Sequence, residues 1–401
     1  MVEYDPFSGA AMADPFAIYR ELRDVSPVHR LDRYDAWALA RFEDVWQVLQ
    51  DRDRFSVVEG PVFDRDRLLV PNAGRPDTTV RRPVPTFASV DPPIHTRLRQ
   101  AMFPAFTPQA CRRLAGQIAG LVSRQLDELD GSSGFDLVGG CAGPIAVATT
   151  LGFLGLPTDD AARLQRLVAD STRREPGTPG ASPSAVVARG ELHTYLTDQV
   201  AQARSGPAGA VISGLLEVTG PDGAALSDSE VAVQLGTLLV GGSETLPKII
   251  AGGFLQLWRH PDQRAEACAD PTLAAGAFDE MVRLEGVLQF VGRTLLVDAD
   301  VAGQPMTAGQ RVLLLLQSAN HDEREFAEPE RFDIHRAPPR QVGFGHGVHF
   351  CIGVHAARAV GVAIVQGLLE RFPTYDIDLS GATRPPSEFQ IGWTRMPLVP
   401  A

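Results

Sequence analysis

The sequence predicts a mostly α-helical fold with a small β region. Apolar residues recur mostly at helical spacing over residues 91–284, and one further apolar helix ends near residue 371. Strand-like patterns are short: a strand pair around residues 34–40, and two runs at residues 294–297 and 312–317 bounded by glycines. Helices therefore dominate the expected architecture.

The first part of the chain mixes short helices with irregular structure. Helices are expected at residues 14–24 and 42–51, followed by a segment rich in proline, arginine and aspartate at residues 55–91. Irregular segments of that length are usually lids or binding loops. Asp91, followed by two prolines, predicts a helix start with Asp91 as its N-cap.

Composition and charge exclude several classes of protein. The 401 residues carry 37 basic and 49 acidic side chains, a formal charge of −12, which argues against a nucleic-acid binder. Lys248 is the only lysine, so an anion site must use arginine, histidine or backbone N–H groups. The four cysteines are widely separated, which indicates a reducing compartment and no disulfide scaffold.

No membrane association is expected. The N-terminal residues include acidic side chains and lack an apolar leader pattern. Residues 137–158 are uncharged, but Pro144 and Pro157 leave too short a helix between them to cross a bilayer. We interpret this stretch as a buried core helix and expect a cytoplasmic protein.

The most informative segment is residues 343–353. Its closely spaced glycines lie just before a helix and allow tight turns and close approach of the backbone to a flat or bulky group. Cys351 falls at the start of that helix, where free N–H groups and the positive end of the dipole favour a thiolate. A thiolate there is a nucleophile, a redox sensor or a metal ligand.

Two other interpretations of this segment stay open. One is a buried free cysteine without chemistry. The other is a zinc site using His346, His349, Cys351 and His355, although that spacing matches no zinc pattern.

Residues 344–353 resemble the haem-binding motif of the cytochromes P-450, Phe-x-x-Gly-x-(His/Arg)-x-Cys-x-Gly. Phe344, Gly347, His349, Cys351 and Gly353 supply every element. The resemblance implies haem b (iron protoporphyrin IX) as cofactor, with Cys351 as the axial iron ligand. It also implies that residues 1–401 form a single cytochrome P-450 domain, with haem between a long central helix and the cysteine loop.

A second landmark of that family is a Glu-x-x-Arg helix motif, which Glu280 and Arg283 match. Isolated acid–base pairs at this spacing are common on helices, so the motif alone is weak. The resemblance adds a second arginine to this buried cluster, and we assign it to Arg331. The three residues are expected to have a structural role.

A third landmark is the Gly-Gly-Ser-Glu-Thr run at residues 241–245, inside a helix expected at residues 227–258. Each interior glycine costs about 1 kcal/mol relative to alanine. Such a cost is tolerated where a ligand or a neighbouring helix approaches the backbone closely. The resemblance places the oxygen-binding groove here, with Gly241 beside the haem and Thr245 and Glu244 as catalytic residues for the proton steps.

The haem propionates need cationic or donor groups. His95 and Arg99 are four residues apart on one helix face, and the resemblance pairs them with Arg293 and His349. Phe344, Gly345, Gly353 and Gly241 complete the expected cofactor contacts.

The implied activity is a monooxygenase that inserts one oxygen atom from O2 into a C–H bond of a medium-sized lipophilic substrate. Electrons would come from a ferredoxin and its NAD(P)H-dependent reductase, docking near Arg358 with Arg112 and Arg113 behind it. The alternative is a haem-thiolate enzyme that performs peroxide-driven oxidation, C–C coupling or isomerisation.

The substrate pocket is expected on the Thr245 face of the central helix. Segments 55–87 and 174–184 would act as lids. The residues expected to line the pocket are Thr237, Val240, Leu288, Gln289 and Ile391, with Thr237 and Gln289 as polar anchors.

Overall fold

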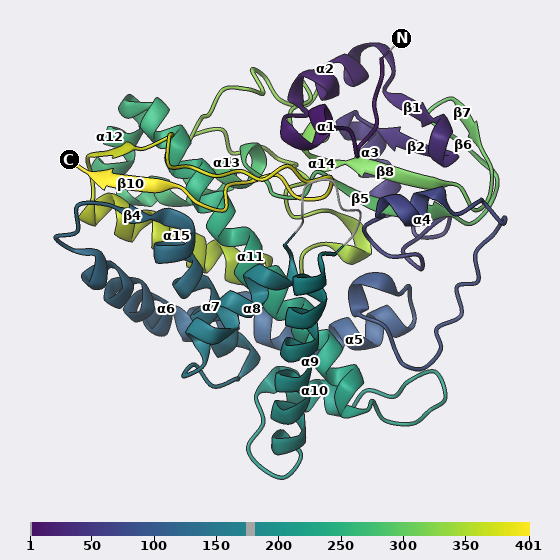
Figure 1. Cartoon of the computed structure of the whole chain (residues 1–401), viewed down its shortest axis with the longest axis horizontal. Coiled ribbons are helices and arrows are strands. Elements are labelled where there is room, and N and C mark those ends of the chain that lie inside the picture. Colours follow the sequence, from purple (N-terminus) through teal and green to yellow (C-terminus); the bar gives the residue numbers. More distant parts are fainter. Residues whose placement is uncertain (1, 174–180) are drawn as a thin grey trace.

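A computed structural model describes residues 2–173 and 181–401 (Figure 1). A five-stranded sheet lies at one end of the molecule with the short N-terminal helices around it, and longer helices fill the remainder (Figure 1). Neighbouring strands in this sheet follow the order β1-β2-β8-β5-β3, in which only β2 and β8 pair in parallel. The predicted fold class, mostly α with a small β region, is confirmed.

The described residues form α-helices with these bounds: α1 (Gly9–Ala13), α2 (Phe16–Val25), α3 (Phe42–Gln50), α4 (Arg65–Leu69), α5 (Ile94–Met102), α6 (Pro108–Leu129), α7 (Gly143–Leu154), α8 (Ala161–Ser171), α9 (Pro183–Ala203), α10 (Ala210–Leu216), α11 (Asp228–Arg259), α12 (Pro261–Ala269), α13 (Ala274–Leu284), α14 (Leu316–Asn320) and α15 (Val354–Arg371). The strands are β1 (Val28–Leu31), β2 (Ala36–Leu39), β3 (Phe55–Ser56), β4 (Phe135–Asp136), β5 (Phe290–Leu295), β6 (Ala299–Val301), β7 (Gln304–Met306), β8 (Arg311–Leu315), β9 (Tyr375–Ile377) and β10 (Pro397–Pro400).

The long helix α11 organises the helical part. It starts with a capping box, in which the Ser227 hydroxyl accepts from the Glu230 amide and the Glu230 carboxylate accepts from the Ser227 amide. Helices α7, α8, α9 and α13 pack around it, and its second half is buried on nearly all sides. A helix that is apolar around most of its circumference belongs in the core of a large fold.

The uncharged stretch after residue 136 is a core segment, as predicted. It begins with a turn of π-helix at Leu137–Ala142 and continues as α7. By length and composition Leu137–Leu154 would be long enough to cross a membrane, but 67% of it is buried inside the protein.

The predicted N-cap at Asp91 is wrong. Helix α5 begins three residues later, at Ile94, without a side-chain cap. The Asp91 carboxylate instead accepts hydrogen bonds from the Ser56 hydroxyl and the Val57 amide (3.3 Å), so it fastens the chain after β3. Most of the predicted lid at residues 174–184 lies outside the described residues; its last part caps and starts α9.

Candidate active site

The Cys351 loop is folded tightly by its own backbone. The Cys351 amide donates to the Phe344 carbonyl (2.9 Å), and the Phe350 amide donates to the Gly347 carbonyl (3.1 Å). Gly347 has a φ of +73° and packs against the Leu49 carbonyl, so a Cβ there would lie 2.1 Å from that oxygen. The loop therefore requires glycine at this position and delivers Cys351 to the start of α15.

The protein alone does not make Cys351 a thiolate. Its thiol lies deep among protein atoms although part of its surface stays open, and burial raises its pKa above the ordinary value. The Gly353 amide and the Arg99 guanidinium oppose that rise without cancelling it. The helix position favours the thiolate less than we expected, because burial outweighs it. A bound metal cation would deprotonate such a thiol outright.

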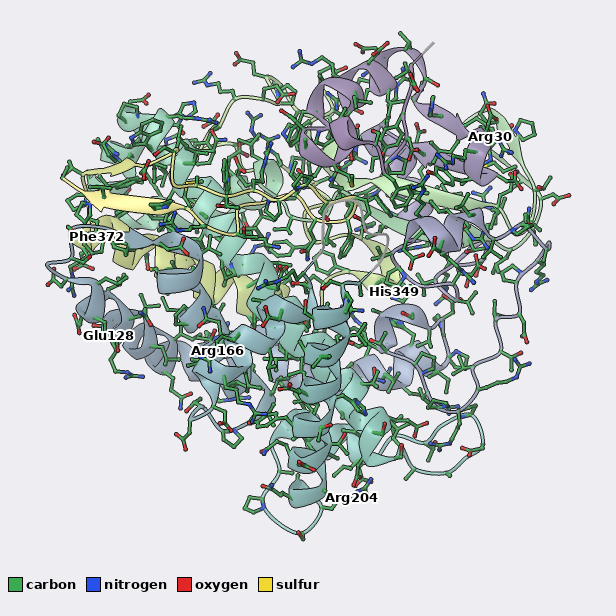
Figure 2. All side chains as sticks on the ribbon, viewed as in Figure 1. Arg30, Glu128, Arg166, Arg204, His349 and Phe372 are labelled. Carbon is green, nitrogen blue, oxygen red and sulfur yellow. The ribbon has the colours of Figure 1, made fainter. Side chains whose placement is uncertain are left out.

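Four cationic or potentially cationic side chains converge near Cys351. His95 and Arg99 come from α5, Arg293 from β5 and His349 from the cysteine loop. The His95 and His349 rings are 4.2 Å apart, and the charge of Arg99 acts on both the His349 ring and the Cys351 sulfur. In Figure 2, His349 lies where the helical part meets the sheet, whereas Arg30 and Arg204 lie at the outer edge.

These groups have no carboxylate in direct contact. Within residues 2–173 and 181–401, neither Arg99 nor Arg293 has a carboxylate at ion-pair distance, although the charge of Asp91 acts on His95 and Arg293 from farther away. The Nε2 atoms of His95 and His349 have no hydrogen-bond partner. Burial lowers the pKa of His95 to about 4, of His349 to about 2 and of Arg293 to about 10, so at pH 7 the histidines are neutral and the arginines carry the charge. A buried arginine without a carboxylate in contact is costly, so the cluster fits a ligand that brings negative charge and accepts hydrogen bonds.

Three predicted cofactor-facing glycines border open space. A Cβ built on Gly241 of α11, or on Gly345 and Gly353 of the cysteine loop, would meet no atom within 4 Å. Gly242 is different, since a Cβ there would lie 2.7 Å from the Thr150 hydroxyl of α7. Both interpretations of the glycine pair therefore hold, one for each residue: Gly241 leaves room for a ligand and Gly242 allows helix packing.

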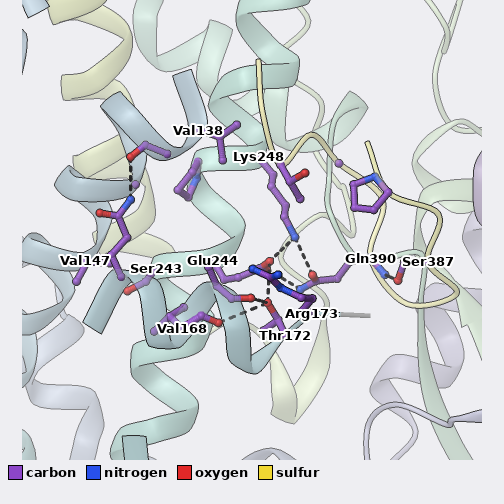
Figure 3. A pocket seen from close by; sticks show the side chains of 18 of the residues that line it. Val138, Val147, Val168, Thr172, Arg173, Ser243, Glu244, Lys248, Ser387 and Gln390 are labelled. Atoms are coloured by element: carbon purple, nitrogen blue, oxygen red, sulfur yellow. Dashed lines mark hydrogen bonds and ion pairs between the residues drawn. The ribbon is translucent and has the colours of Figure 1, made fainter. Parts of the chain in front are cut away.

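Thr245 and Glu244 lie on different sides of α11. The Thr245 hydroxyl donates to the Gly241 carbonyl (2.9 Å), and its side chain is half-buried. Glu244 points into a side cavity of about 380 Å³ bounded by α7, α8, α11 and residues 385–394 (Figure 3).

Four residues form a closed network in that cavity (Figure 3). Glu244 forms an ion pair with Lys248, one helical turn later, and accepts hydrogen bonds from the Gln390 amide (2.7 Å) and the Thr172 hydroxyl (3.3 Å). Lys248 also donates to the Gln390 side-chain carbonyl (2.8 Å). Sequence reasoning assigned Lys248 no role, although its spacing from Glu244 predicts the pair. It missed Gln390 and Thr172, which have no local signal.

The buried Glu-x-x-Arg cluster forms, but our prediction that Arg331 is its third member is wrong. Arg283 makes two hydrogen bonds to Glu280 (2.8 and 2.7 Å), and the second arginine on that carboxylate is Arg336 (3.0 Å). The Arg331 side chain is 59% exposed and pairs with Glu328. Only the Arg331 carbonyl joins the cluster, because the turn after it brings Arg336 back over Glu280.

The predicted substrate residues divide into two groups. Leu288 and Ile391 lie on adjacent segments, and Val240 is half-buried on α11. Gln289 is not a free polar anchor, because its side chain accepts from the Tyr19 hydroxyl (2.8 Å) and donates to the Ser387 carbonyl. Thr237 is also engaged, with its hydroxyl 2.7 Å from that of Thr86.

Residues 82–87, which we call the strap, are fastened along the first half of α11. Arg82 forms ion pairs with Asp222 and Glu230, and the Val84 amide donates to Glu230 (2.7 Å). The Phe87 amide donates to the side chain of Gln234 (2.7 Å), which itself donates to the Pro85 carbonyl (2.9 Å). The lid predicted at residues 55–87 is therefore bonded to α11 through its last six residues.

The zinc interpretation finds no support in the geometry. His346 stacks on Trp46 with ring centroids 3.5 Å apart and bonds to Gln50, whereas His349 faces His95. The part of the chain that the structure describes contains no group of three or more histidine, cysteine or acidic side chains arranged to hold a metal.

The site and the fold together define a class of protein. The site has a cysteine at a helix start, a glycine-cleared surface on a long helix, and two arginines and two histidines without a carboxylate in contact. These features fit a flat, anionic metal porphyrin. The donor set therefore fits a haem protein with a thiolate ligand.

Comparison with known proteins identifies the family. A cytochrome P450 family model matches residues 267–394. The vitamin D(3) 25-hydroxylase of Pseudonocardia autotrophica is 33% identical over 406 residues, covering 99% of this chain and 96% of that protein. The cytochrome P450 monooxygenase PikC of Streptomyces venezuelae is 33% identical over 375 residues, covering 92% and 86%. The chain belongs to the cytochrome P450 family.

Solved structures agree with this assignment. CalO2 superposes with a TM-score of 0.84 at 28% identity, covering 100% of this chain and 99% of that chain. Cytochrome P450 CYP109Q5 from Chondromyces apiculatus gives a TM-score of 0.82 at 29% identity, covering 99% and 98%. The protein is thus a haem-dependent oxidoreductase of the monooxygenase type.

Proposed function

We propose that this protein hydroxylates a medium-sized lipophilic substrate with O2, using electrons from a ferredoxin and its NAD(P)H-dependent reductase in the cytoplasm. The observation that carries the proposal is the cluster of two arginines and two histidines, with no carboxylate in contact, beside Cys351. Haem, when bound, supplies the redox centre at which O2 is activated. Cys351 would ligate its iron, and Arg99, Arg293, His95 and His349 would hold its propionates.

The two catalytic residues would manage protons from different sides of α11. Thr245 presents a hydroxyl next to the open surface at Gly241 and keeps it oriented by donating to the Gly241 carbonyl. Glu244 faces the side cavity, where it can exchange protons with solvent. An acid and an alcohol in adjacent positions favour O2 over peroxide as the oxidant.

The docking face for the electron donor is supported by the packing of α6 and α15. Arg371 of α15 pairs with Asp127 near the end of α6 (2.7 Å), so the two helices run side by side in the same direction. That alignment places the exposed Arg112 and Arg113 at the level of Arg358, on the Cys351 side. Arg358 itself pairs with Asp279 (2.8 Å) and lies over the Phe344 ring.

A lipophilic substrate is supported by the lining available near Thr245. Val240, Leu288 and Ile391 are apolar, and the two side chains expected to serve as polar anchors are already hydrogen-bonded. We therefore expect binding driven by apolar contact more than by fixed polar groups.

The decisive experiment combines spectra with reconstituted turnover. The holoenzyme should show a haem band that is red-shifted in the reduced CO complex. Vitamin D3, the compound named for one relative, should be screened for binding by the spin-state shift of the haem. With NADPH, a ferredoxin and its reductase under ¹⁸O2, the product should carry one labelled oxygen. Product formed only with added peroxide would overturn the proposal.

A further inference from the structure

Gln390 connects two parts of the molecule that the proposed function treats separately. Its side chain holds Glu244 and Lys248 in the side cavity, and its backbone lies beside Leu288 as an isolated β-bridge. The residue after it, Ile391, is expected to line the substrate pocket.

The segment around Gln390 is fastened firmly to residues 287–289, which we expect to line the substrate pocket. The Gln289 amide donates to the Phe389 carbonyl (2.8 Å), and the Ile391 amide donates to the Val287 carbonyl (2.8 Å). The Gln289 side chain adds a bond to the Ser387 carbonyl. A displacement of Leu288 or Ile391 by a substrate therefore moves Gln390 as well.

Residues 387–392 also contact Lys248 directly. A Cβ on Gly392 would lie 3.1 Å from the Lys248 Cβ, so the backbone at this glycine touches the lysine stem. Lys248 and Glu244 expose only 9% and 8% of their side chains, which leaves the pair little freedom to find other partners. The position of the Glu244 carboxylate therefore depends on the position of residues 387–392.

We propose that Gln390 is a positioning residue that makes the placement of the Glu244 carboxylate depend on the occupancy of the haem-side pocket. The inference rests on the proposed role of Glu244 in proton delivery. A well-seated substrate fixes the Ile391 segment, and Gln390 then holds Glu244 where it delivers protons. A poorly seated or missing substrate loosens that hold, and reduced oxygen leaves as peroxide.

The first test measures where the electrons go. Gln390→Met keeps the side-chain length but removes both hydrogen bonds. In the holoenzyme, with NADPH, a plant-type ferredoxin and its reductase, Q390M should raise the H2O2 released per NADPH severalfold and increase the solvent deuterium isotope effect. Adding Q390M to Glu244→Gln should change neither value further, because Gln390 acts through Glu244.

The matched control is Gln165→Met. Gln165 lines the same cavity but donates to the Gly139 carbonyl (2.9 Å) and makes no contact with Glu244. Q165M should leave the peroxide yield unchanged. An equal rise in both variants, or no rise in Q390M where E244Q shows one, would overturn the inference.

The second test needs no turnover. Because Lys248 is the only lysine, lysine labelled with ¹³C at its ε carbon gives one side-chain NMR signal in the diamagnetic CO complex of the reduced holoenzyme. Replacing CO by 4-phenylimidazole, an azole that ligates the haem iron and fills the space above it, should shift this signal. The response should fall by at least half in Q390M and persist in Q165M.

The two tests distinguish a failure of the proposed proton role of Glu244 from a failure of the inference about Gln390. If E244Q does not raise peroxide release, the proton role of Glu244 fails, and the Lys248 signal still decides whether Gln390 links the pocket to the network. An unchanged response of that signal in Q390M contradicts the link.

Discussion

The two polar groups around the haem-side space differ in how their hydrogen bonds are satisfied. On the Cys351 side, His95 and His349 each leave a buried ring nitrogen without a partner among the described residues. On the far side of α11, the Glu244 carboxylate accepts from an ammonium, an amide and a hydroxyl. Unsatisfied buried groups mark a place that a ligand completes, whereas a satisfied network marks a place where the protein fixes its own geometry.

The largest effect should come from removing the Cys351 sulfur, on the side where buried ring nitrogens lack hydrogen-bond partners. Cys351→Ala should abolish the red-shifted band of the reduced CO complex and all NADPH-dependent product, because Cys351 supplies the one thiol on that loop. Visible spectra of the purified protein give the result. Cys268→Ala, a half-buried thiol on α12, is the control and should retain both. A thiolate spectrum that survives in C351A would refute the assignment.

The second-largest effect should come from the buried Glu280 cluster, whose hydrogen bonds are satisfied within the protein. Arg336→Ala should lower the free energy of unfolding by about 3 kcal/mol, because it strips one partner from the buried Glu280 carboxylate. Arg331→Ala should cost less than about 1 kcal/mol, since its ion pair is exposed. Urea unfolding of the two holoenzymes compares them directly. The reverse order would restore Arg331 as the cluster residue.

The third effect separates structure from proton transfer. Thr245→Ala should keep the thiolate spectrum but lower product formation roughly tenfold or more, with electrons diverted to H2O2. Thr197 of α9 is a matched control, because its hydroxyl also donates to the carbonyl four residues back (2.8 Å). T197A should leave the ratio of product to peroxide unchanged. Undisturbed coupling in T245A would contradict its role.

The smallest effect should come from His321, which is buried and hydrogen-bonded. Burial lowers the pKa of His321 from 6.5 to about 3, while one ring nitrogen is paired with the Gln317 carbonyl (2.7 Å). The unfolded chain takes up a proton below pH 6.5 and the folded protein does not until about pH 3. The stability that His321 contributes is therefore complete above pH 6.5 and declines as the pH falls toward 3.

This linkage can be measured as a difference between two proteins. The unfolding free energy of the native protein minus that of His321→Asn should shrink by about 1–2 kcal/mol between pH 7 and pH 5. Subtracting the variant removes the contributions of other groups. A difference that stays constant with pH would mean that folding does not shift the pKa of His321.

Local patterns predicted most of the fold and the core of the site. The helix expected at residues 227–258 is α11, and the expected haem-side residues Cys351, His349, His95 and Arg99 meet in one place. The helix was predictable because helix periodicity acts over short distances along the chain. The roles of the four residues toward haem stay predictions.

What the sequence did not predict depends on contacts between distant segments. Gln289 looked like a free amide until the fold placed Tyr19 against it, 270 positions away. Gln390 reaches Glu244 across 146 positions, with no pattern in either neighbourhood to signal the contact. Arg336 and Arg331 are equally basic, and only the turn between them decides which one faces Glu280.

The strap has a consequence for the shape of what this enzyme accepts. Residues 82–87 are bonded to Glu230 and Gln234 of α11, and residues 387–392 are bonded through their backbone to residues 287–289. Both segments are therefore held in place before a substrate arrives. Because little ordering of the protein is needed on binding, we expect rigid molecules that match the available space to bind better than flexible ones of the same composition.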